Sequence, residues 1–285
     1  MVQALQGLIK ELGEDRSLDL QKQLRRRIEA LDRLDAYLEH VLPPALAAET
    51  YQQARKLYAR FEAVNSAYYQ SIRRDILRGA GRDALFQLVS SEHTAGFAKG
   101  EGYDYLDDLV SGVLQFETPE AGVVQLPAEM VLYQPTPARH IFDLIGRIGF
   151  AEEDVLVDLG SGLGHVPLLA SICAGVRSIG IELAAVYVDC ARRSAEALDL
   201  KRVSFFQQDA READLSSGTV FYLYTPFTGS ILRSVLDALR QQAASREIRI
   251  CSFGPCTPVL AKEPWLEPAG TCEEDRIAIF RCQRC

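Results

Sequence analysis

The sequence predicts an α/β fold, with a mostly parallel sheet covered by helices, preceded by an all-α N-terminal domain. Three observations lead to this prediction. In residues 1–130, apolar side chains recur every three or four positions, which is the period of a helix facing a core. Residues 131–285 instead alternate short apolar runs with amphipathic stretches, as chains that build parallel sheets do. The last two apolar runs flank an acidic loop that contains glycine, which predicts a closing antiparallel hairpin.

The helical part contains two long apolar stripes. The first covers residues 20–41, and we expect Ser17 to cap its helix and Pro43 and Pro44 to end it. The second covers residues 51–72 and is rich in tyrosine. Aromatic residues can form a stacking platform for bases, but this spacing favours a buried seam between helices.

Charge is unevenly distributed along the helical part. Residues 51–82 hold seven basic and two acidic side chains, whereas residues 101–130 hold seven acidic and no basic ones. We interpret the two segments as solvated faces that can pair; the alternative is a basic docking surface for an acidic partner. The whole chain has 31 basic and 39 acidic residues and a net charge of −8. A nucleic-acid partner is therefore disfavoured.

In the second part of the chain, the predicted strands and helices alternate regularly. Strands are expected at residues 155–158, 178–182, 203–207, 220–224 and 247–253. Helices are expected at residues 166–174, 185–198 and 229–243, and the hairpin at 265–268 and 276–281.

The strongest local signal is the run VDLGSGLGHV, residues 157–166, between a predicted strand and a predicted helix. Its glycines are Gly160, Gly162 and Gly164. This is the context of a nucleotide-binding loop, in which glycine allows a tight turn and close approach of a ligand. His165 stands where a dinucleotide-binding loop has its third glycine, and Asp158 would repel a pyrophosphate. A positively charged ligand without phosphate, such as S-adenosyl-L-methionine, suits the loop better.

Two further acids follow predicted strands. Glu182 ends the second strand and can accept hydrogen bonds from both hydroxyls of a ribose. Asp209 follows the third strand and can accept one from an adenine amine. Because the carboxyl ends of successive parallel strands meet at one edge of a sheet, these acids are expected to face one crevice.

The motifs VDLGSGLG, GIEL and QDA, in this order, resemble those of class I S-adenosylmethionine-dependent methyltransferases over residues 133–285. The resemblance implies a Rossmann-like sheet of seven strands whose last strand runs antiparallel. It implies S-adenosylmethionine as cofactor and methyl transfer as activity. It also implies that Asp158 and the glycine loop with Ser161 hold the methionine part, Glu182 the ribose, and Asp209 with Ala210 the adenine.

The loop before the first strand, LYQPTPARH, is similar to that of the non-SET lysine methyltransferases acting on nucleosomal histone. They have Tyr-x-x-Thr at this place, matched here by Tyr133 and Thr136, which are expected to contact the cofactor. Thr136 is also expected to cap the next helix. Gln134 stands where their loop is acidic, and their Asn at the end of the fourth strand is missing. The likeness therefore concerns the cofactor site and not histone as substrate.

The fourth strand leads into the expected acceptor side of the site, Tyr224, Thr225, Pro226 and Phe227. Enzymes of the class that methylate amide or ring nitrogens often have Asn/Asp/Ser-Pro-Pro-aromatic there, of which only the proline and the aromatic residue are present. The acceptor stays unidentified, and an amine of a protein or small molecule is the expected kind. No catalytic base is assigned, because His140 and His165 are expected to have structural roles.

Two alternative functions remain. The first is a non-catalytic protein that binds S-adenosylmethionine as a sensor or scaffold. The second is an NAD-dependent oxidoreductase, which Asp158 and His165 disfavour.

The cysteines and the N-terminus predict a cytoplasmic protein with reduced thiols. Seven cysteines is an odd number, the N-terminus lacks the pattern of an export signal, and no apolar run is long enough for a membrane span. Cys282 and Cys285 form one C-x-x-C pair without the second pair that a zinc ribbon needs, so no metal site is predicted.

Overall fold

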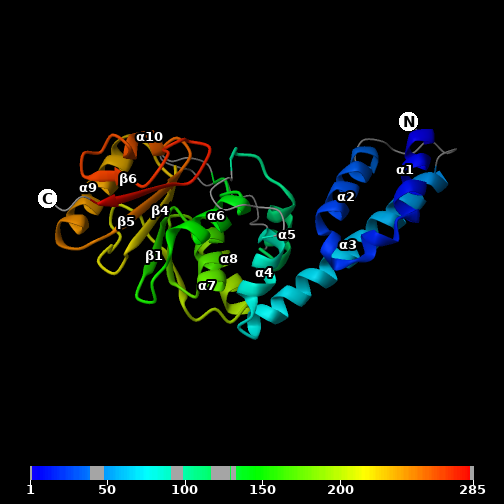
Figure 1. The fold of residues 1–285 in the computed structure, drawn as a ribbon, viewed down its shortest axis with the longest axis horizontal. Helices are drawn as coiled ribbons and strands as arrows, with labels where there is room; N and C mark the ends of the chain where they lie inside the picture. The colour runs from blue at the N-terminus through cyan, green and yellow to red at the C-terminus, as the bar shows by residue number, and fades with distance from the viewer. Residues whose placement is uncertain (1, 39–47, 91–98, 117–128, 130–132, 283–285) are drawn as a thin grey trace. The chain divides into compact units, whose positions relative to one another are not determined.

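The computed structural model describes residues 2–38, 48–90, 99–116, 129 and 133–282. The chain forms two compact units, which are described separately below. The first comprises residues 1–75 and 104–113, and the second comprises residues 76–103 and 114–285. The predicted α/β fold with a helical N-terminal part is confirmed (Figure 1).

The helices are α1 (Val2–Glu14), α2 (Leu24–Leu38), α3 (Ala48–Leu77), α4 (Gly81–Ser90), α5 (Tyr105–Leu114), α6 (Ala138–Ile148), α7 (His165–Ala174), α8 (Ala185–Ala197), α9 (Gly229–Ser245) and α10 (Thr257–Leu260). Two short 3-10 helices are η1 (Arg16–Asp19) and η2 (Gln21–Gln23). The strands are β1 (Val155–Leu159), β2 (Arg177–Glu182), β3 (Val203–Gln207), β4 (Val220–Tyr224), β5 (Arg249–Phe253), β6 (Leu266–Pro268) and β7 (Ala278–Cys282).

The first unit is a helical bundle around leucines of α1 and α2 and the apolar stripe of α3. Tyr51, Ala54 and Phe61 of that stripe are buried in this core. The predicted helix seam is therefore confirmed. The predicted cap at Ser17 is wrong, because Ser17 lies within η1 and α2 begins only at Leu24. Pro43 and Pro44 lie outside the described residues.

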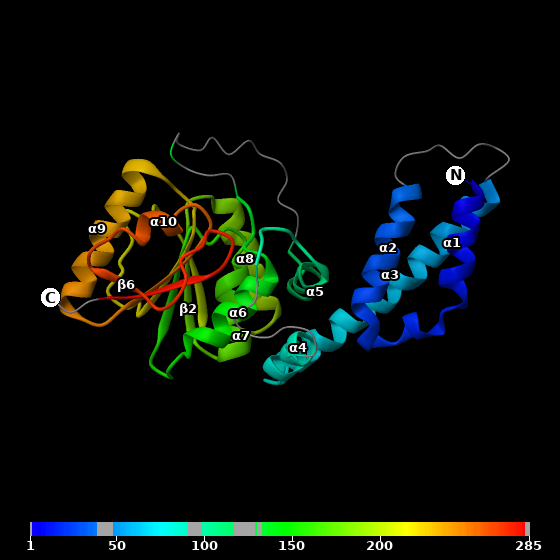
Figure 2. The same ribbon diagram turned by 45° about the horizontal axis from the view of Figure 1, so that its top comes forward.

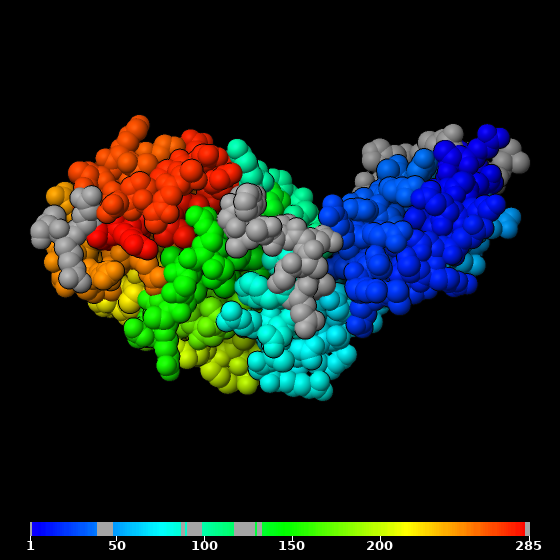
Figure 3. Space-filling view, viewed as in Figure 1, coloured from blue at the N-terminus to red at the C-terminus, as the bar shows by residue number. Residues whose placement is uncertain are grey.

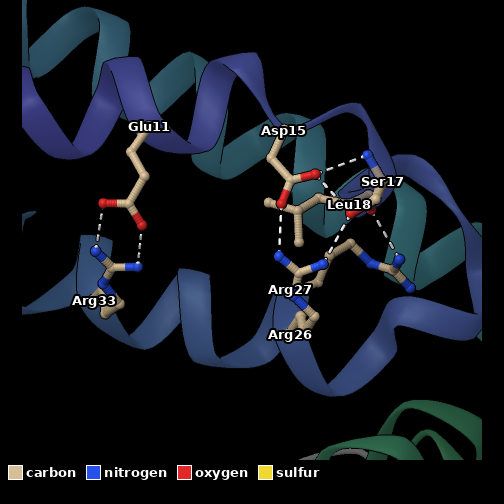
Figure 4. Close-up of polar contacts among 7 residues, drawn as sticks. All are labelled: Glu11, Asp15, Ser17, Leu18, Arg26, Arg27 and Arg33. Atoms are coloured by element: carbon tan, nitrogen blue, oxygen red, sulfur yellow. Dashed lines mark hydrogen bonds and ion pairs between the residues drawn. The ribbon is translucent and has the colours of Figure 1, made fainter.

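A buried arginine joins two parts of this bundle. Arg27 of α2 has no exposed surface, and it donates to the side-chain oxygen of Asn65 on α3 at 2.6 Å and to the Leu18 carbonyl at 2.9 Å. Figure 4 shows Arg27 reaching Leu18, and beside it the exposed pair of Arg33 with Glu11. Burial lowers the pKa of Arg27, so these oxygen dipoles are what compensates its charge.

The second unit contains a seven-stranded sheet in the order β3-β2-β1-β4-β5-β7-β6. β1 pairs in parallel with β2 and β4, β2 with β3, and β4 with β5. β7 runs antiparallel to both of its neighbours, β5 and β6. The predicted sheet with a reversed last strand and a closing hairpin is confirmed.

Helices cover both faces of this sheet. α6, α7 and α8 lie on one face and α9 on the other in both ribbon views (Figures 1 and 2). The apolar side of α9 packs on the sheet through Val235, Leu236 and Leu239, which are fully buried. The residues of β6 and β7, in orange and red, reach the surface in Figure 3.

The compact units do not coincide with the boundary expected near residue 130. The described residues 76–90 and 99–103 fall in the second unit, where α4 packs against α7. The division of labour between residues 1–130 and 131–285 stays a prediction. Among the described helices, none is both long and apolar enough to cross a membrane.

Candidate functional site

A cavity of about 600 Å³ lies within the second unit, at the carboxyl ends of β1, β2 and β4. A pocket at this edge of an open parallel sheet is where ligands bind in such folds. The predicted residues that line it are Tyr133, Thr136, Asp158, Gly160, Ser161, Glu182, Ala210, Tyr224, Thr225, Pro226 and Phe227. The cofactor side and the acceptor side predicted from the sequence therefore face the same space.

The three glycines of the loop after β1 all have positive φ, +88° at Gly160, +51° at Gly162 and +84° at Gly164. A Cβ at Gly160 would run into Pro226, and one at Gly162 into the ring of Tyr133. Neither Gly162 nor Gly164 is among the lining residues. Gly162 allows the ring of Tyr133, a wall of the cavity, to approach the loop, whereas Gly164 makes room for Phe205 of β3.

Two carboxylates end neighbouring strands at the cavity. Asp158 is buried, and burial together with the nearby Glu182 raises its pKa well above the ordinary value of an aspartate. Glu182 accepts hydrogen bonds from the backbone N–H of Gly162 at 2.9 Å and of Ala184 at 2.8 Å. This end of the cavity is electronegative and would be stabilised by a cation.

Ser161 lies in the same wall with its hydroxyl buried and without a hydrogen-bond partner in the described part of the chain. A buried hydroxyl without a partner is costly. This hydroxyl lies against Gly180 of β2, where a Cβ would run into it.

Tyr133 and His165 pack together beside the glycine loop. The Tyr133 hydroxyl lies 3.1 Å from Nδ1 of His165, and burial lowers the pKa of His165 to about 4. The imidazole is therefore neutral, and its tautomer decides which of the two groups donates this hydrogen bond. The ring of Tyr133 also contacts that of Tyr187, with centroids 4.9 Å apart. These contacts position Tyr133 as a wall of the cavity.

Thr136 lines the cavity but does not cap a helix. Its hydroxyl is 2.9 Å from that of the buried Tyr222 on β4. The N-cap of α6 is Pro137, without a side-chain bond. The predicted cap is therefore wrong, because the hydroxyl has a partner across the sheet edge.

The side chain of Asp209, which was predicted to contact the cofactor, is paired with Arg211 instead. Its carboxylate accepts from Nε and Nη2 of Arg211, at 3.0 and 2.7 Å, and this partner lowers its pKa. Gln208 and Ala210, its neighbours in the chain, line the cavity, whereas Asp209 does not.

The end of β4 has an unusual backbone. Thr225 has φ of +36°, a left-handed conformation that strains a β-branched residue. Its hydroxyl accepts from the Cys256 N–H at 2.9 Å and donates to the Phe253 carbonyl at 3.3 Å. Such strain is concentrated at functional sites. Tyr224 beside it has its pKa raised to about 12, chiefly by burial.

The sequence reasoning did not single out Glu101, a charged residue that also lines the cavity. Glu101 belongs to a segment, residues 99–103, that we call the strap. Its Gly100 carbonyl accepts from Nη2 of Arg139 at 2.6 Å and from Nε2 of His140 at 2.7 Å. The Tyr103 hydroxyl donates to the Pro135 carbonyl at 3.0 Å. The glycines on both sides of Glu101 were the available signal that the helical pattern is interrupted there.

The charged residues lining the cavity have one sign. Among the described residues that line it, Glu101, Asp158 and Glu182 are acidic, and none is lysine or arginine. Groups of three or more His, Cys, Asp or Glu arranged for a metal are absent from the described residues. Cys285, the second cysteine of the C-x-x-C pair with Cys282, lies outside the described residues.

Residues 130–223 match the model of the family described as "Histone methylation protein DOT1". No curated protein matches the chain.

Solved structures with a similar fold include several methyltransferases. An RNA methyltransferase from Salinibacter ruber in complex with S-adenosyl-L-homocysteine is 29% identical, with 52% of this chain and 92% of that chain covered and a TM-score of 0.44. A precorrin-6y C5,15-methyltransferase from Geobacter metallireducens is 17% identical, with 53% and 90% covered and a TM-score of 0.42. A tRNA methyltransferase from B. subtilis is 14% identical, with 52% and 66% covered and a TM-score of 0.40.

The prediction that disfavours nucleic acid finds no support in these comparisons. The family match, the strand order with its reversed β7 and the acid–glycine loop beside Glu182 agree with the fold expected from the sequence. This chain is a class I, S-adenosylmethionine-dependent methyltransferase with a Rossmann-like fold.

Proposed function

We propose that the cavity binds S-adenosylmethionine and that the protein transfers its methyl group to an amine nitrogen. The observation that carries this proposal is the charge of the cavity wall, three carboxylates without a lysine or arginine among its described residues. S-adenosylmethionine has an ammonium and a sulfonium and no phosphate, so it complements this wall. A second ligand with an amine complements it as well.

Each part of the cofactor has candidate partners. Asp158 and the glycine loop with Ser161 face the methionine part. Glu182 faces the ribose, where its carboxylate is already oriented by two backbone N–H groups. Ala210 lies at the adenine end, and a contact from Asp209 requires that its pair with Arg211 opens.

The cofactor supplies a methyl group on a good leaving group, so the chain's own task is to position an acceptor and exclude water. Tyr224 and the strained turn at Thr225 form the wall on the acceptor side. The amine nitrogen has to be uncharged when it attacks, and its proton leaves to water or to a nearby base. We assign no base, because His140 does not line the cavity and the ring of His165, which does, is hydrogen-bonded to Tyr133.

The test is methyl labelling of a cell extract with isotopically labelled S-adenosylmethionine, sorted into metabolites, protein and nucleic acid. We expect label in an amine, identified by its stability to base and by mass spectrometry. Label only on nucleic-acid bases or on oxygen would overturn the amine assignment. Cofactor binding without labelling of any fraction would favour the sensor alternative.

Replacing Asp158 with asparagine is expected to weaken binding of S-adenosylhomocysteine by about a hundredfold, because a charge-assisted contact in a buried site is lost. The same change should raise the melting temperature at pH 7 by ~2–5 °C, as removal of a destabilised functional group commonly does. Calorimetric titration and thermal unfolding measure the two effects.

The sign of the stability effect follows from the raised pKa of Asp158. The folded protein binds this proton more tightly than the unfolded chain, so stability falls as the pH rises above the ordinary pKa of aspartate. The gain from asparagine should therefore vanish in strong acid. Asp199→Asn is the control, because Asp199 is exposed and has a positive φ that asparagine tolerates. Unchanged ligand affinity in Asp158→Asn would contradict the assignment.

Cofactor binding should depend on pH through the same group. A cation stabilises the ionised form of Asp158, whose pKa is raised in the free protein by burial and by Glu182. We therefore expect the Kd for S-adenosylmethionine to fall as the pH rises from acid to neutral, with release of a proton on binding. Calorimetry in buffers of different ionisation enthalpy measures that proton. A Kd independent of pH, or equal proton release in Asp158→Asn, would argue against this origin.

A further inference from the structure

We propose that Glu101 is an acceptor-side anchor that binds the acceptor as a cationic amine at the cavity. This inference rests on the proposed function and names the residue and the charge state of the substrate that it selects.

The first step is the position of Glu101. It lines the cavity and is exposed to solvent, and its carboxylate has no hydrogen bond or ion pair among the described residues. Its charge contributes to the raised pKa of Tyr224, so it acts on the end of β4 where the acceptor side was predicted. A carboxylate that is open to water at the cavity and is close enough to influence Tyr224 can meet an incoming ligand.

The second step is the way the strap holds this side chain. Gly100 has φ of +86°, accepts hydrogen bonds from Arg139 and His140 of α6, and donates its N–H to the Asp275 carbonyl at 2.9 Å. Lys99 lies 3.7 Å from the Asp275 carboxylate. The backbone on the N-terminal side of Glu101 is therefore fixed by contacts from two distant parts of the unit.

The ring of His140 is fully buried against Phe253, with centroids 4.4 Å apart, and burial lowers its pKa. The neutral ring donates from Nε2 to the Gly100 carbonyl and keeps the strap in place at neutral pH. Little backbone freedom has to be lost for Glu101 to be presented to a ligand.

The third step is charge. S-adenosylmethionine carries one net positive charge, from its ammonium, sulfonium and carboxylate. Asp158 and Glu182 face it, and Glu101 is the third carboxylate of the same wall. A cationic acceptor would compensate the negative charge of Glu101, whereas a phosphate or carboxylate ligand would be repelled. The acceptor class is therefore an alkylamine that arrives protonated and loses its proton to water before methylation.

The experiment measures binding to the full chain loaded with S-adenosylhomocysteine. The probes are Nα-acetyl-L-lysine methylamide, which carries an ammonium, and Nα-acetyl-L-norleucine methylamide, its neutral analogue. We expect the wild type to bind the ammonium probe about fivefold more tightly than the neutral one, and Glu101→Gln to remove about this factor, the upper range for a solvent-exposed ion pair. The preference should shrink at high salt.

Two variants keep the test specific. Glu101→Asp should retain part of the preference, because it keeps the charge on a shorter side chain. Glu267→Gln, which removes an exposed carboxylate on β6 outside the cavity lining, should leave the preference unchanged. All variants should bind S-adenosylhomocysteine as the wild type does.

Equal binding of both probes by the wild type, or an unchanged preference in Glu101→Gln, would overturn the anchor while leaving the proposed function intact. Failure of the wild type to bind S-adenosylhomocysteine would overturn the proposed function, and the anchor with it.

Discussion

Replacement of Gly162 with valine is expected to weaken S-adenosylhomocysteine binding by about a thousandfold or more, because overpacking and backbone strain each cost about 1–3 kcal/mol. The Cβ of any residue at this position would run into the ring of Tyr133, which forms a wall of the cavity. The backbone N–H of Gly162 also holds Glu182. One substitution therefore displaces a wall and a ligand-facing carboxylate together.

Gly175→Val is the matched control for backbone strain. Gly175 also has a positive φ, +64°, but a Cβ there would meet open space at the end of α7. Both variants should lose some thermal stability, whereas only Gly162→Val should lose ligand affinity by calorimetry. Retained affinity in Gly162→Val, with circular dichroism like that of the wild type, would show that the loop does not form the site.

The replacement of Arg27 with methionine is expected to destabilise the first unit by about 3–5 kcal/mol. Methionine has a similar length but cannot donate hydrogen bonds, so the Leu18 carbonyl and the side-chain oxygen of Asn65 would lose a buried partner. Because the oxygen groups remain after the charge is removed, the change leaves them unsatisfied rather than replacing the network with an apolar one.

Two optical signals separate the units in urea unfolding. The only tryptophan of the chain, Trp265, is buried in the core of the second unit. Far-ultraviolet circular dichroism includes the helices of the first unit. Arg27→Met should move the dichroism transition to lower urea and leave the main fluorescence transition in place.

Arg33→Met is the control for Arg27→Met, since Arg33 pairs with Glu11 on the surface, and its loss should cost less than about 1 kcal/mol. Similar shifts for both variants would contradict a special role for the buried arginine.

The sheet and its order of elements were predictable from local patterns. Strands such as Val155–Leu159 and Val220–Tyr224 are buried along nearly their whole length, and they appear in the sequence as almost continuous apolar runs. The positive φ of Gly160, Gly162 and Gly164 agrees with the reason for which these glycines were singled out. The position of Asp158 and Glu182 at one edge of the sheet was predictable as well, because neighbouring parallel strands have their carboxyl ends at the same edge.

The features that the sequence did not reveal depend on contacts between residues that are far apart in the chain. Thr136 seemed suited to cap α6, but Tyr222, which is far along the chain, takes its hydroxyl. Glu101 was placed with the helical part because nothing near it in the sequence indicates that Arg139 and His140 hold the adjoining glycine. Asp209 is a different case, since its partner Arg211 is only two residues away, and a pair at that spacing was open to prediction.

The hydrogen bond between Gly100 and the Asp275 carbonyl has a consequence for the way the protein is made. A ribosome completes the strap long before it adds residue 275. In the growing chain, the glycine loop and Glu182 can come together as soon as β1 and β2 have left the exit tunnel. The contact of the strap with Asp275 can form only after the segment preceding β7 has emerged. The acceptor side of the cavity therefore includes a contact that is completed late in the synthesis of the chain.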